Sequence, residues 1–247
     1  TYLYQHVIEE SEKYPLKNFI VLVPEQFTMQ TQKDLVSMHP RHGIMNIDVL
    51  SFARLAYRVF EETGTKQMQV LDDEGKNLIL RKIAGDYENK LTVLKGNIKK
   101  LGYISEVKSV ISEFTQYDIG EEEMDEMLDH LDEDSRLYYK LKDIRLLYEG
   151  FQDYLRERYI TKEELLDVLN SQVKESELLK NSVVVLDGFT GFTPVQNRLI
   201  LELMRCCKEV WVTVTMDERE NPYAYKHPYQ LFGLSKQMVT TLVRMAG

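Results

Sequence analysis

Residues 182–194 read SVVVLDGFTGFTP, and this stretch decides the predicted fold. It opens with a run of valines and a leucine, which is typical of a parallel strand that is covered on both faces. Asp187 follows the run directly. Because ligands bind at the carboxyl ends of strands in such sheets, Asp187 is the first candidate for a functional side chain.

The turn after this strand carries signals of its own. Gly188 and Gly191 allow the chain to reverse sharply. Thr193 is a good N-cap residue, and Pro194 suits the first position of a helix that we expect to reach about Cys207. The stretch therefore predicts a strand, a turn and a helix, which is the repeating unit of an α/β fold.

Three other runs predict strands of the same sheet. Residues 19–23 read FIVLV, and Pro24 ends this buried run because proline cannot continue a strand ladder. Residues 45–50 predict a further strand, and residues 209–215 predict a last strand that ends at Asp217. A polar loop follows the first of these strands and passes into a helix. We therefore expect an α/β domain with a buried parallel sheet.

A helix over residues 52–62 has two distinct faces, and Ser51 is its expected N-cap. The apolar face carries Phe52, Leu55, Ala56, Val59 and Phe60. The opposite face carries Arg54, Tyr57, Arg58 and Glu61. Residues three or four apart lie on the same side of a helix, so a cation and an aromatic ring share the polar face.

The pattern changes to helices between about residues 71 and 172, with little strand signal. The clearest helical runs are residues 77–84, 104–114 and 137–158. A helical block between two strand-bearing halves indicates an all-helical insertion into an α/β domain. We expect the α/β core over residues 1–68 and 176–247, and the insertion over residues 69–175.

The net charge of −9 is concentrated in one segment. Residues 118–134 hold ten carboxylates and no Lys or Arg, so the other residues together have a charge of about +1. One interpretation is the solvated face of a short helix that covers Met124, Met127, Leu128 and Leu131. The other is an acidic patch that docks a protein.

Several classes of protein are excluded by composition. No apolar run approaches the roughly 18 residues needed to span a bilayer, and the first residues lack the basic start of a secretory signal. The adjacent Cys206 and Cys207 offer too few ligands for a structural metal site. We expect them to be buried thiols in a reducing compartment, and the protein to be cytoplasmic. The five histidines show no metal spacing, and no Ser-His-Asp or Cys-His arrangement is indicated.

A phosphate-binding loop of the form Gly-x-x-x-x-Gly-Lys-Ser/Thr does not occur in the chain. The chain opens in what reads as the middle of a helix, with Tyr4, Val7 and Ile8 on one side. A phosphate loop would lie immediately before Thr1, so we expect residues upstream of it.

Three motifs together resemble the N-terminal region of the AddB family. They are LVPEQFT at residues 22–28, VLSFARLAYRV at residues 49–59 and LDGFTGFTP at residues 186–194. AddB is one of the two subunits of the bacterial ATP-dependent helicase/deoxyribonuclease AddAB, also called RexAB. The resemblance covers the whole chain and implies a P-loop NTPase fold of the superfamily 1 helicase type with an inserted helical subdomain. It also implies a heterodimer with AddA that resects double-strand breaks for recombination.

In that family the helicase-like part of AddB reads the Chi sequence in single-stranded DNA and is not the motor. Positions that match its Chi-reading surface are Gln26, Thr28, Phe52, Arg54, Tyr57 and Phe192. Some relatives carry tryptophan at the position of Tyr57, and stacking survives this difference. The chemistry is suitable, because single strands are held by stacking and by polar contacts, and Phe189 offers a further ring.

Five of these six residues also have a plain structural interpretation. Phe52 and Phe192 can be core residues, and Arg54 can be a surface ion-pair partner of Glu61. Gln26 and Thr28 can be helix-capping loop residues.

The resemblance also bears on ATP hydrolysis. An active helicase of this class follows the strand-end aspartate, a magnesium ligand, with a glutamate that polarises water. Here Gly188 follows Asp187, and loss of a catalytic base typically costs ~10²–10⁴-fold in rate. We therefore expect no catalytic residue in this part, and ATP with Mg²⁺ only in the full-length protein. Asp187 is either a residual nucleotide or magnesium contact or a turn-capping residue.

Two other functions stay open from the sequence. One is a working ATPase motor, which needs a complete phosphate loop and another water-positioning residue. The second is a scaffold whose acidic insertion docks AddA and whose strand ends touch no DNA.

Overall fold

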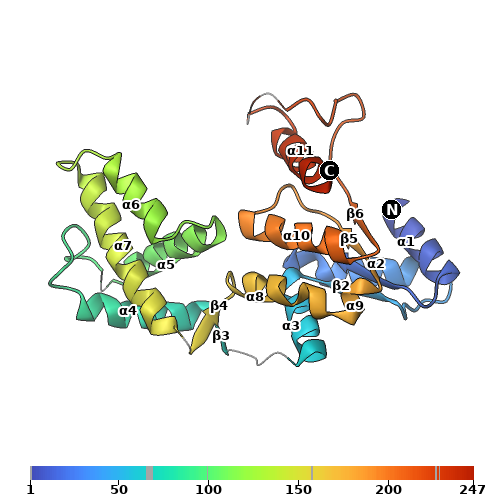
Figure 1. Cartoon of the computed structure of the whole chain (residues 1–247), viewed down its shortest axis with the longest axis horizontal. Coiled ribbons are helices and arrows are strands. Elements are labelled where there is room, and N and C mark those ends of the chain that lie inside the picture. The colour runs from blue at the N-terminus through green and yellow to red at the C-terminus, as the bar shows by residue number, and fades with distance from the viewer. Residues whose placement is uncertain (1, 65–68, 99, 157, 226, 228) are drawn as a thin grey trace. The chain divides into compact units, whose positions relative to one another are not determined.

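The computed structural model describes residues 2–64, 69–98, 100–156, 158–225, 227 and 229–247 (Figure 1). The chain divides into two compact units. Unit 1 comprises residues 1–66 and 166–247, and unit 2 comprises residues 67–165.

Unit 1 is built on a four-stranded sheet in which every strand pair is parallel. The strand order is β2-β1-β5-β6. The strands are β1 (Asn18–Leu22), β2 (Ile47–Leu50), β5 (Ser182–Leu186) and β6 (Glu209–Val212). The predicted α/β class with a parallel sheet is confirmed.

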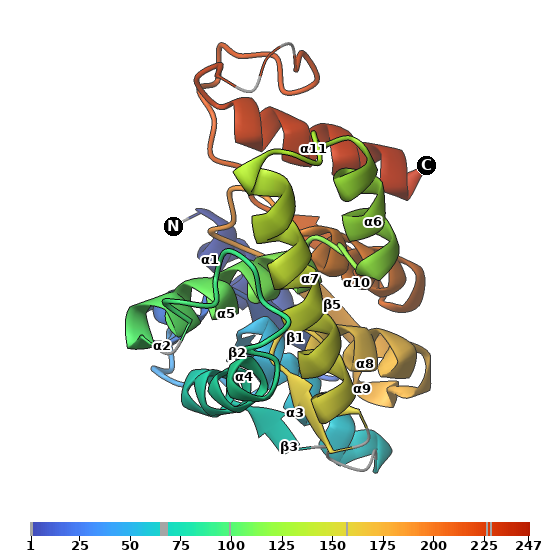
Figure 2. The same ribbon diagram turned by 90° about the vertical axis from the view of Figure 1, so that its left-hand side faces the viewer.

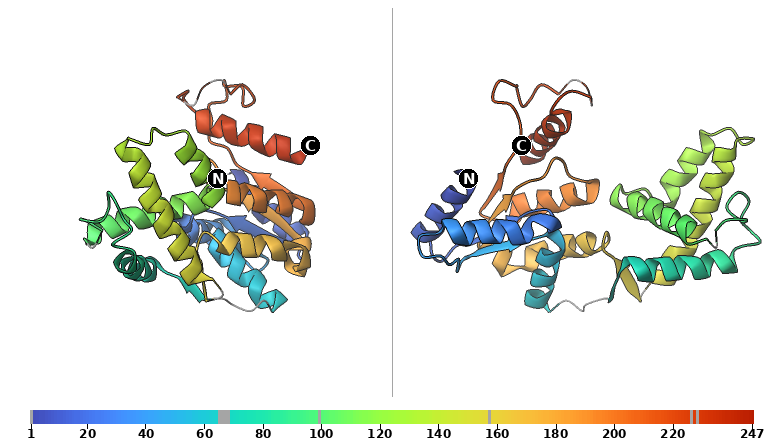
Figure 3. Two further views of the ribbon diagram at one scale, coloured as in Figure 1. Left: turned by 60° about the vertical axis from the view of Figure 1, so that its left-hand side comes forward. Right: turned by 180° about the vertical axis from the view of Figure 1, so that it is seen from behind.

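Helices cover both faces of this sheet. One face carries α1 (Tyr2–Lys13) and α2 (Thr28–Met38), and the other carries α9 (Glu177–Lys180) and α10 (Pro194–Cys206) (Figures 1 and 3). The core under α1 and α2 contains alternate strand residues, Phe19, Val21, Val183 and Val185. Burial on both faces explains why these strands read as unbroken apolar runs.

The connections on the two sides of the sheet run in opposite directions. From β1 the chain passes through α2 to β2, whereas from β5 it passes through α10 to β6 on the other side. The topological switch point therefore lies between β1 and β5, where α/β proteins place their ligands.

The remaining helices of unit 1 fit the local sequence signals. They are η1 (Glu25–Phe27), α3 (Phe52–Thr63), α8 (Leu165–Gln172), η2 (Val173–Glu175) and α11 (Gly233–Ala246). As predicted, Ser51 caps α3 by accepting the Arg54 N–H at 3.4 Å, and the predicted apolar face of α3 is buried. Gly64 ends α3 with a φ of 67°, a conformation that favours glycine.

The helix after β5 also begins as predicted. Thr193 and Gln196 form a reciprocal capping box, and Pro194 is the first helical residue. Two predicted strands are shorter than expected: β2 begins at Ile47 rather than at the fully exposed Met45, and β6 ends at Val212.

Unit 2 is mainly helical. Its helices are α4 (Asp73–Asp86), α5 (Leu101–Gln116), α6 (Glu121–Asp129) and α7 (Arg136–Leu155) (Figure 2). The prediction that this block is all-helical is wrong, because β3 (Gln69–Leu71) and β4 (Tyr159–Thr161) pair as parallel strands. Three-residue strands are too short to give a periodic signal, and their partners lie about 90 residues apart in the chain.

Two buried polar clusters hold unit 2 together. The Asp143 carboxylate accepts the backbone N–H groups of Thr92, Val93 and Leu94 at 2.7–3.1 Å. The buried Lys76 ammonium pairs with the Glu163 carboxylate at 2.7 Å. Charged groups inside a protein are tolerated only when they are paired in this way.

The two adjacent cysteines are less buried than predicted. Cys206 and Cys207 are free and only half-buried, rather than fully buried. Partial burial raises the pKa of the Cys207 thiol to about 12. The Cys207 thiol is therefore protonated and unreactive at neutral pH.

Candidate nucleic-acid interface

The four parallel strands of unit 1 end in register. Leu22 pairs with Leu50 on one side and with Leu186 on the other, and Leu186 pairs with Val212. The loops that follow these strands therefore leave the sheet at one edge. We call this edge, together with residues 23–30, 51–57, 187–193 and 213, the strand-end rim.

The loops after β1 and β5 touch at the switch point. The Asp187 N–H donates to the Leu22 carbonyl at 2.9 Å and closes the ladder between these strands. Gly188 has a φ of 77°, and a Cβ on it would lie 3.7 Å from the Pro24 ring. A side chain at position 188 would be strained by this backbone conformation.

The Asp187 carboxylate is held by two hydroxyl groups. The Tyr4 hydroxyl donates to Oδ2 at 2.8 Å, and the Thr213 hydroxyl donates to Oδ1 at 2.6 Å. Burial raises the pKa of Tyr4 to about 12, and the negative charge of Asp187 adds to this rise. The Tyr4 hydroxyl therefore stays protonated and can donate to Asp187 at neutral pH.

Asp187 is the one carboxylate that directly follows a strand at the rim, and the exposed Glu25 lies three residues beyond the end of β1. Within the described residues, no group of three or more His, Cys, Asp or Glu side chains could hold a metal ion. A lone carboxylate suits Mg²⁺ only when phosphate oxygens and water supply the other ligands. Because Gly188 has no side chain to orient water, these two positions do not by themselves form a hydrolytic site.

Three of the rings at the rim form a continuous row. The ring centres of Phe52 and Phe189 are 5.5 Å apart, and those of Phe189 and Phe192 are 5.1 Å apart. Phe52 is buried, whereas Phe189 and Phe192 are half-buried. We call these three residues the rim aromatic cluster. Phe52 anchors the cluster, and the other two rings keep surface that a base could stack on.

The polar face of α3, which begins at this edge of the sheet, presents a cation and a ring. Arg54 is exposed and Tyr57 is 39% exposed. Arg58 on the same face pairs with Asp48 at 3.3 Å. Among the residues that the structure describes, the Arg54 guanidinium forms no ion pair, so its charge is open to an anionic ligand.

The two predicted DNA-contact residues in the loop after β1 differ in their exposure to solvent. Gln26 is exposed, so both its amide donor and its carbonyl acceptor face solvent. Thr28 is buried, and its hydroxyl donates to the Glu25 carbonyl at 3.0 Å. Of the six predicted DNA-contact residues, Thr28 and Phe52 are thus placed to support the rim rather than to face a ligand.

Sequence reasoning missed other residues of the rim. Phe27 is 48% exposed and Met29 is 82% exposed, although both lie in a stretch interpreted as a polar loop. Their apolar character next to Gln26 was the available signal. The contacts of Tyr4 and Thr213 with Asp187 left no signal in the sequence, since they join residues 183 and 26 positions apart.

No helix within the described ranges has the length and the apolar character needed to cross a membrane.

Comparison with known proteins gives consistent matches to one family. The family model described as "ADDB, N-terminal" matches residues 1–247. In Lachnoclostridium phytofermentans, the B subunit of the ATP-dependent helicase/deoxyribonuclease is 47% identical over 245 residues, which is 99% of this chain and 21% of that protein.

Proteins with the same name from two further organisms are also similar. The one from Alkaliphilus oremlandii is 39% identical over 197 residues, 80% of this chain and 17% of that protein. The one from Clostridium kluyveri is 39% identical over 201 residues, 81% of this chain and 17% of that protein. The chain spans about one-fifth of the length of these relatives.

Proposed function

Because this chain belongs to the AddB N-terminal family, we propose that it is the helicase-like, single-strand-reading part of a longer AddB-type subunit. The relatives are named as B subunits of ATP-dependent helicase/deoxyribonucleases. The whole protein would then act with an AddA-type subunit in the repair of DNA double-strand breaks. Within that enzyme, unit 1 binds single-stranded DNA and reads Chi.

The observation that carries this proposal is that one edge of the sheet holds both a row of rings and Arg54, whose guanidinium forms no ion pair among the described residues. A single strand presents phosphates, which need a cation, and unstacked bases, which need flat apolar surfaces. Arg54 meets the first need, and Tyr57, Phe189 and Phe192 meet the second. Each base stacked on an aromatic ring contributes roughly 1–3 kcal/mol.

Sequence reading requires polar contacts to base edges in addition. The exposed Gln26 amide can donate and accept, which suits the edge of an adenine or another unpaired base. Thr28 and Phe52 are buried under this surface. The Thr28 hydroxyl bonds to the Glu25 carbonyl, and the Phe52 ring packs against the ring of Phe189. Substitution of these two residues should therefore disturb the rim without removing a direct DNA contact.

An ATPase motor is the second candidate, and the position of Asp187 at the switch point is the observation that favours it. If the full-length protein binds ATP with Mg²⁺, Asp187 is the residue of this chain that would hold the metal, which would neutralise charge on the phosphates. Gly188 offers no group to position the attacking water. We therefore favour a role in DNA reading over a role in hydrolysis.

The proposal is tested in the assembled two-subunit enzyme with Arg54→Ala and Tyr57→Ala combined. We expect single-strand affinity at the Chi-reading step to fall about 10–100-fold, corresponding to the loss of one stacked base and one phosphate contact. Chi recognition should be lost, while duplex unwinding continues at the wild-type rate.

Arg58→Ala is the matched control, because Arg58 lies on the same helix face but already pairs with Asp48. It should change Chi recognition less than twofold. A double variant that recognises Chi as well as wild type would contradict the proposal and favour a scaffold role.

The motor candidate needs its own measurement. In an enzyme whose AddA motor has been inactivated, we expect little DNA-stimulated ATP hydrolysis. Turnover that persists there and disappears on Asp187→Ala would establish unit 1 as a motor instead.

A further inference from the structure

Unit 2 contains an open groove that the proposed function does not use. It has a volume of about 760 Å³ and lies between α6, the first half of α7 and the end of α5. Figures 1 and 2 show α6 running beside α7. The groove floor includes Phe114, Ile119 and Ile144, which belong to the hydrophobic core of unit 2 or pack against it.

The edges of the groove carry large apolar side chains that face solvent. Tyr117 is 57% exposed, Met127 is 40% exposed and Leu137 is 59% exposed. Scattered exposed apolar residues are ordinary, but a group that surrounds an apolar groove is typical of an interaction site. Methionine is common on surfaces that bind helices, because its flexible side chain adapts to the partner.

One wall of the groove is strongly acidic. Glu123 and Glu126 of α6 line it, within a segment of ten carboxylates and no Lys or Arg. Lys140 of α7 is on the opposite wall. The nearby Arg145 pairs with two other carboxylates of α6, Asp125 at 2.8 Å and Glu121 at 3.8 Å, neither of which lines the groove.

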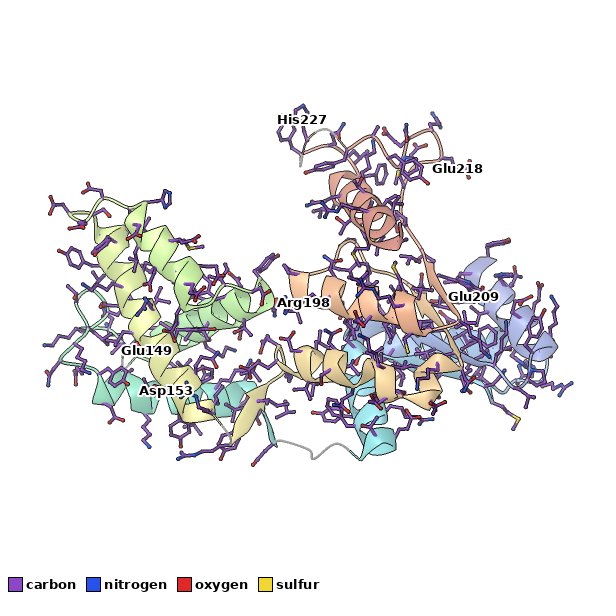
Figure 4. The ribbon with its side chains drawn as sticks, viewed as in Figure 1. Glu149, Asp153, Arg198, Glu209, Glu218 and His227 are labelled. Atoms are coloured by element: carbon purple, nitrogen blue, oxygen red, sulfur yellow. The ribbon has the colours of Figure 1, made fainter. Side chains whose placement is uncertain are left out.

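Figure 4 labels Glu149 and Asp153, which lie on the later half of α7, beyond the residues that line the groove.

We propose that this groove docks a basic amphipathic helix from a partner protein. Apolar residues of the partner would enter the groove, and its Lys or Arg residues would lie along α6. Leu137 and Ile144 are seven residues apart on α7, which is about 10 Å at 1.5 Å per residue. A helix with apolar residues at positions i, i+3 or i+4, and i+7 has the same length, so about two turns fill the groove.

The negative charge of the α6 wall argues against other occupants of the groove. DNA is excluded because its phosphates would lie against the carboxylates of α6. A neutral apolar molecule would gain nothing from those carboxylates, whereas a cationic helix gains attraction that weakens with added salt. This proposal is independent of the proposed DNA-reading function, which rests on residues of unit 1.

The test uses the 247-residue chain and a fluorescent helical peptide of about 14 residues with leucines at i, i+4 and i+7 and flanking lysines. A matched peptide carries glutamate in place of each lysine. Fluorescence anisotropy should show that the basic peptide binds at least tenfold more tightly than the acidic peptide. The affinity of the basic peptide should fall as salt is raised.

Two pairs of variants locate the binding. Glu126→Lys should weaken binding of the basic peptide about tenfold, while Glu122→Lys, on the same helix but outside the groove, should change it less than twofold. Met127→Ser combined with Leu137→Ser should also weaken binding at least tenfold. Leu78→Ser is its control, because Leu78 is an exposed leucine on α4 outside this groove. Glu123 is left unchanged, since its carboxylate accepts the Gly120 N–H that begins α6.

Three results would overturn the proposal. The first is equal binding of the two peptides, and the second is binding that ignores both groove variants. The third is binding to the 247-residue chain but not to the full-length protein, which would make a segment of the same protein the occupant. Because none of these measurements involves DNA, their failure leaves the proposed reading of Chi untouched.

Discussion

The strand-end rim of unit 1 and the groove of unit 2 both expose apolar side chains, but they surround them with opposite charge. The rim carries the exposed Arg54 and a row of aromatic rings, whereas at the groove Glu123 and Glu126 line a wall of α6. Flat rings with a cation suit unpaired bases and phosphates, and an apolar groove with carboxylates suits a basic helix. The identity of the charged neighbours, rather than the amount of exposed apolar surface, therefore separates the two kinds of partner.

The distribution of charge between the units supports this difference. Residues 67–165 hold 15 of the 31 Lys and Arg residues and 23 of the 40 Asp and Glu residues, which leaves a charge of −8 there and −1 in unit 1. The overall acidity of the chain is therefore no argument against DNA binding by unit 1. It also means that stacking must supply much of the affinity, because long-range attraction to DNA is weak.

The largest expected effect tests whether the two units are separate in stability as well as in chemistry. Asp143→Ala removes an acceptor from three backbone N–H groups in unit 2 and should lower its free energy of unfolding by at least about 3 kcal/mol. Trp211, the only tryptophan, lies in β6 of unit 1 and reports on that unit alone. Urea unfolding followed by circular dichroism should shift, while unfolding followed by tryptophan fluorescence should not.

Asp153→Ala is the matched control on α7, because Asp153 is exposed and pairs with Arg156 at the surface, at 3.2 Å. It should change stability by less than about 0.5 kcal/mol. If the urea midpoints from fluorescence and from circular dichroism shift together in Asp143→Ala, the two units unfold as one body. The two units would then not be separate in stability.

The next effect concerns the rim aromatic cluster. Phe189 is the middle ring, so Phe189→Ala removes stacking surface and both ring contacts. We expect single-strand affinity of the assembled enzyme to fall about tenfold, within the 1–3 kcal/mol of one stacked base. Phe189→Tyr should keep most of the affinity.

Tyr14 provides the control for this change, because it precedes β1 and so lies toward the opposite edge of the sheet. Tyr14→Ala should leave binding within twofold of wild type. Equal losses from Phe189→Ala and Tyr14→Ala would mean that binding does not depend on the rim.

The smallest expected effect concerns the hydrogen bond from the Tyr4 hydroxyl to Asp187. Burial raises the pKa of Tyr4 to about 12 in the folded chain, so the unfolded chain loses this proton first, near pH 10. The contribution of the Tyr4 hydroxyl to stability is therefore complete below pH 10 and is lost as the pH rises from 10 to 12. Tyr4→Phe should cost about 1 kcal/mol at pH 9, and this difference from wild type should disappear by pH 12.

Urea midpoints of the two proteins, measured side by side from pH 9 to pH 12, check this prediction. Lysines also titrate in this range, but they do so in both proteins and cancel in the difference. A difference that stays constant with pH would show that the hydroxyl bond to Asp187 does not stabilise the fold.

Much of unit 1 could be predicted from the sequence because its signals are local. The unbroken apolar runs of β1 and β5 indicate a sheet buried on both faces, and Ser51 and Thr193 mark the starts of α3 and α10. Parallel strands then place the following loops at one edge. For this reason the rim, and the place of Arg54 on the polar face of α3, could be predicted from the sequence.

What could not be predicted depends on contacts between distant residues. The pairing of β3 with β4 and the bond from Tyr4 to Asp187 join segments far apart in the chain. Thr28 is buried and its hydroxyl donates to the Glu25 carbonyl, whereas threonine is found mostly on protein surfaces. The groove of unit 2 likewise depends on how α5, α6 and α7 pack, although the acidic segment beside it is plain in the sequence.

The most direct test is to photo-crosslink a single strand carrying iodouracil near Chi to the assembled enzyme and to map the attached residues by mass spectrometry. Iodouracil reacts with aromatic rings that stack on it, so the account predicts attachment at Tyr57, Phe189 or Phe192, with none on the helices of unit 2. Attachment that avoids all three rings and falls on unit 2 would contradict it.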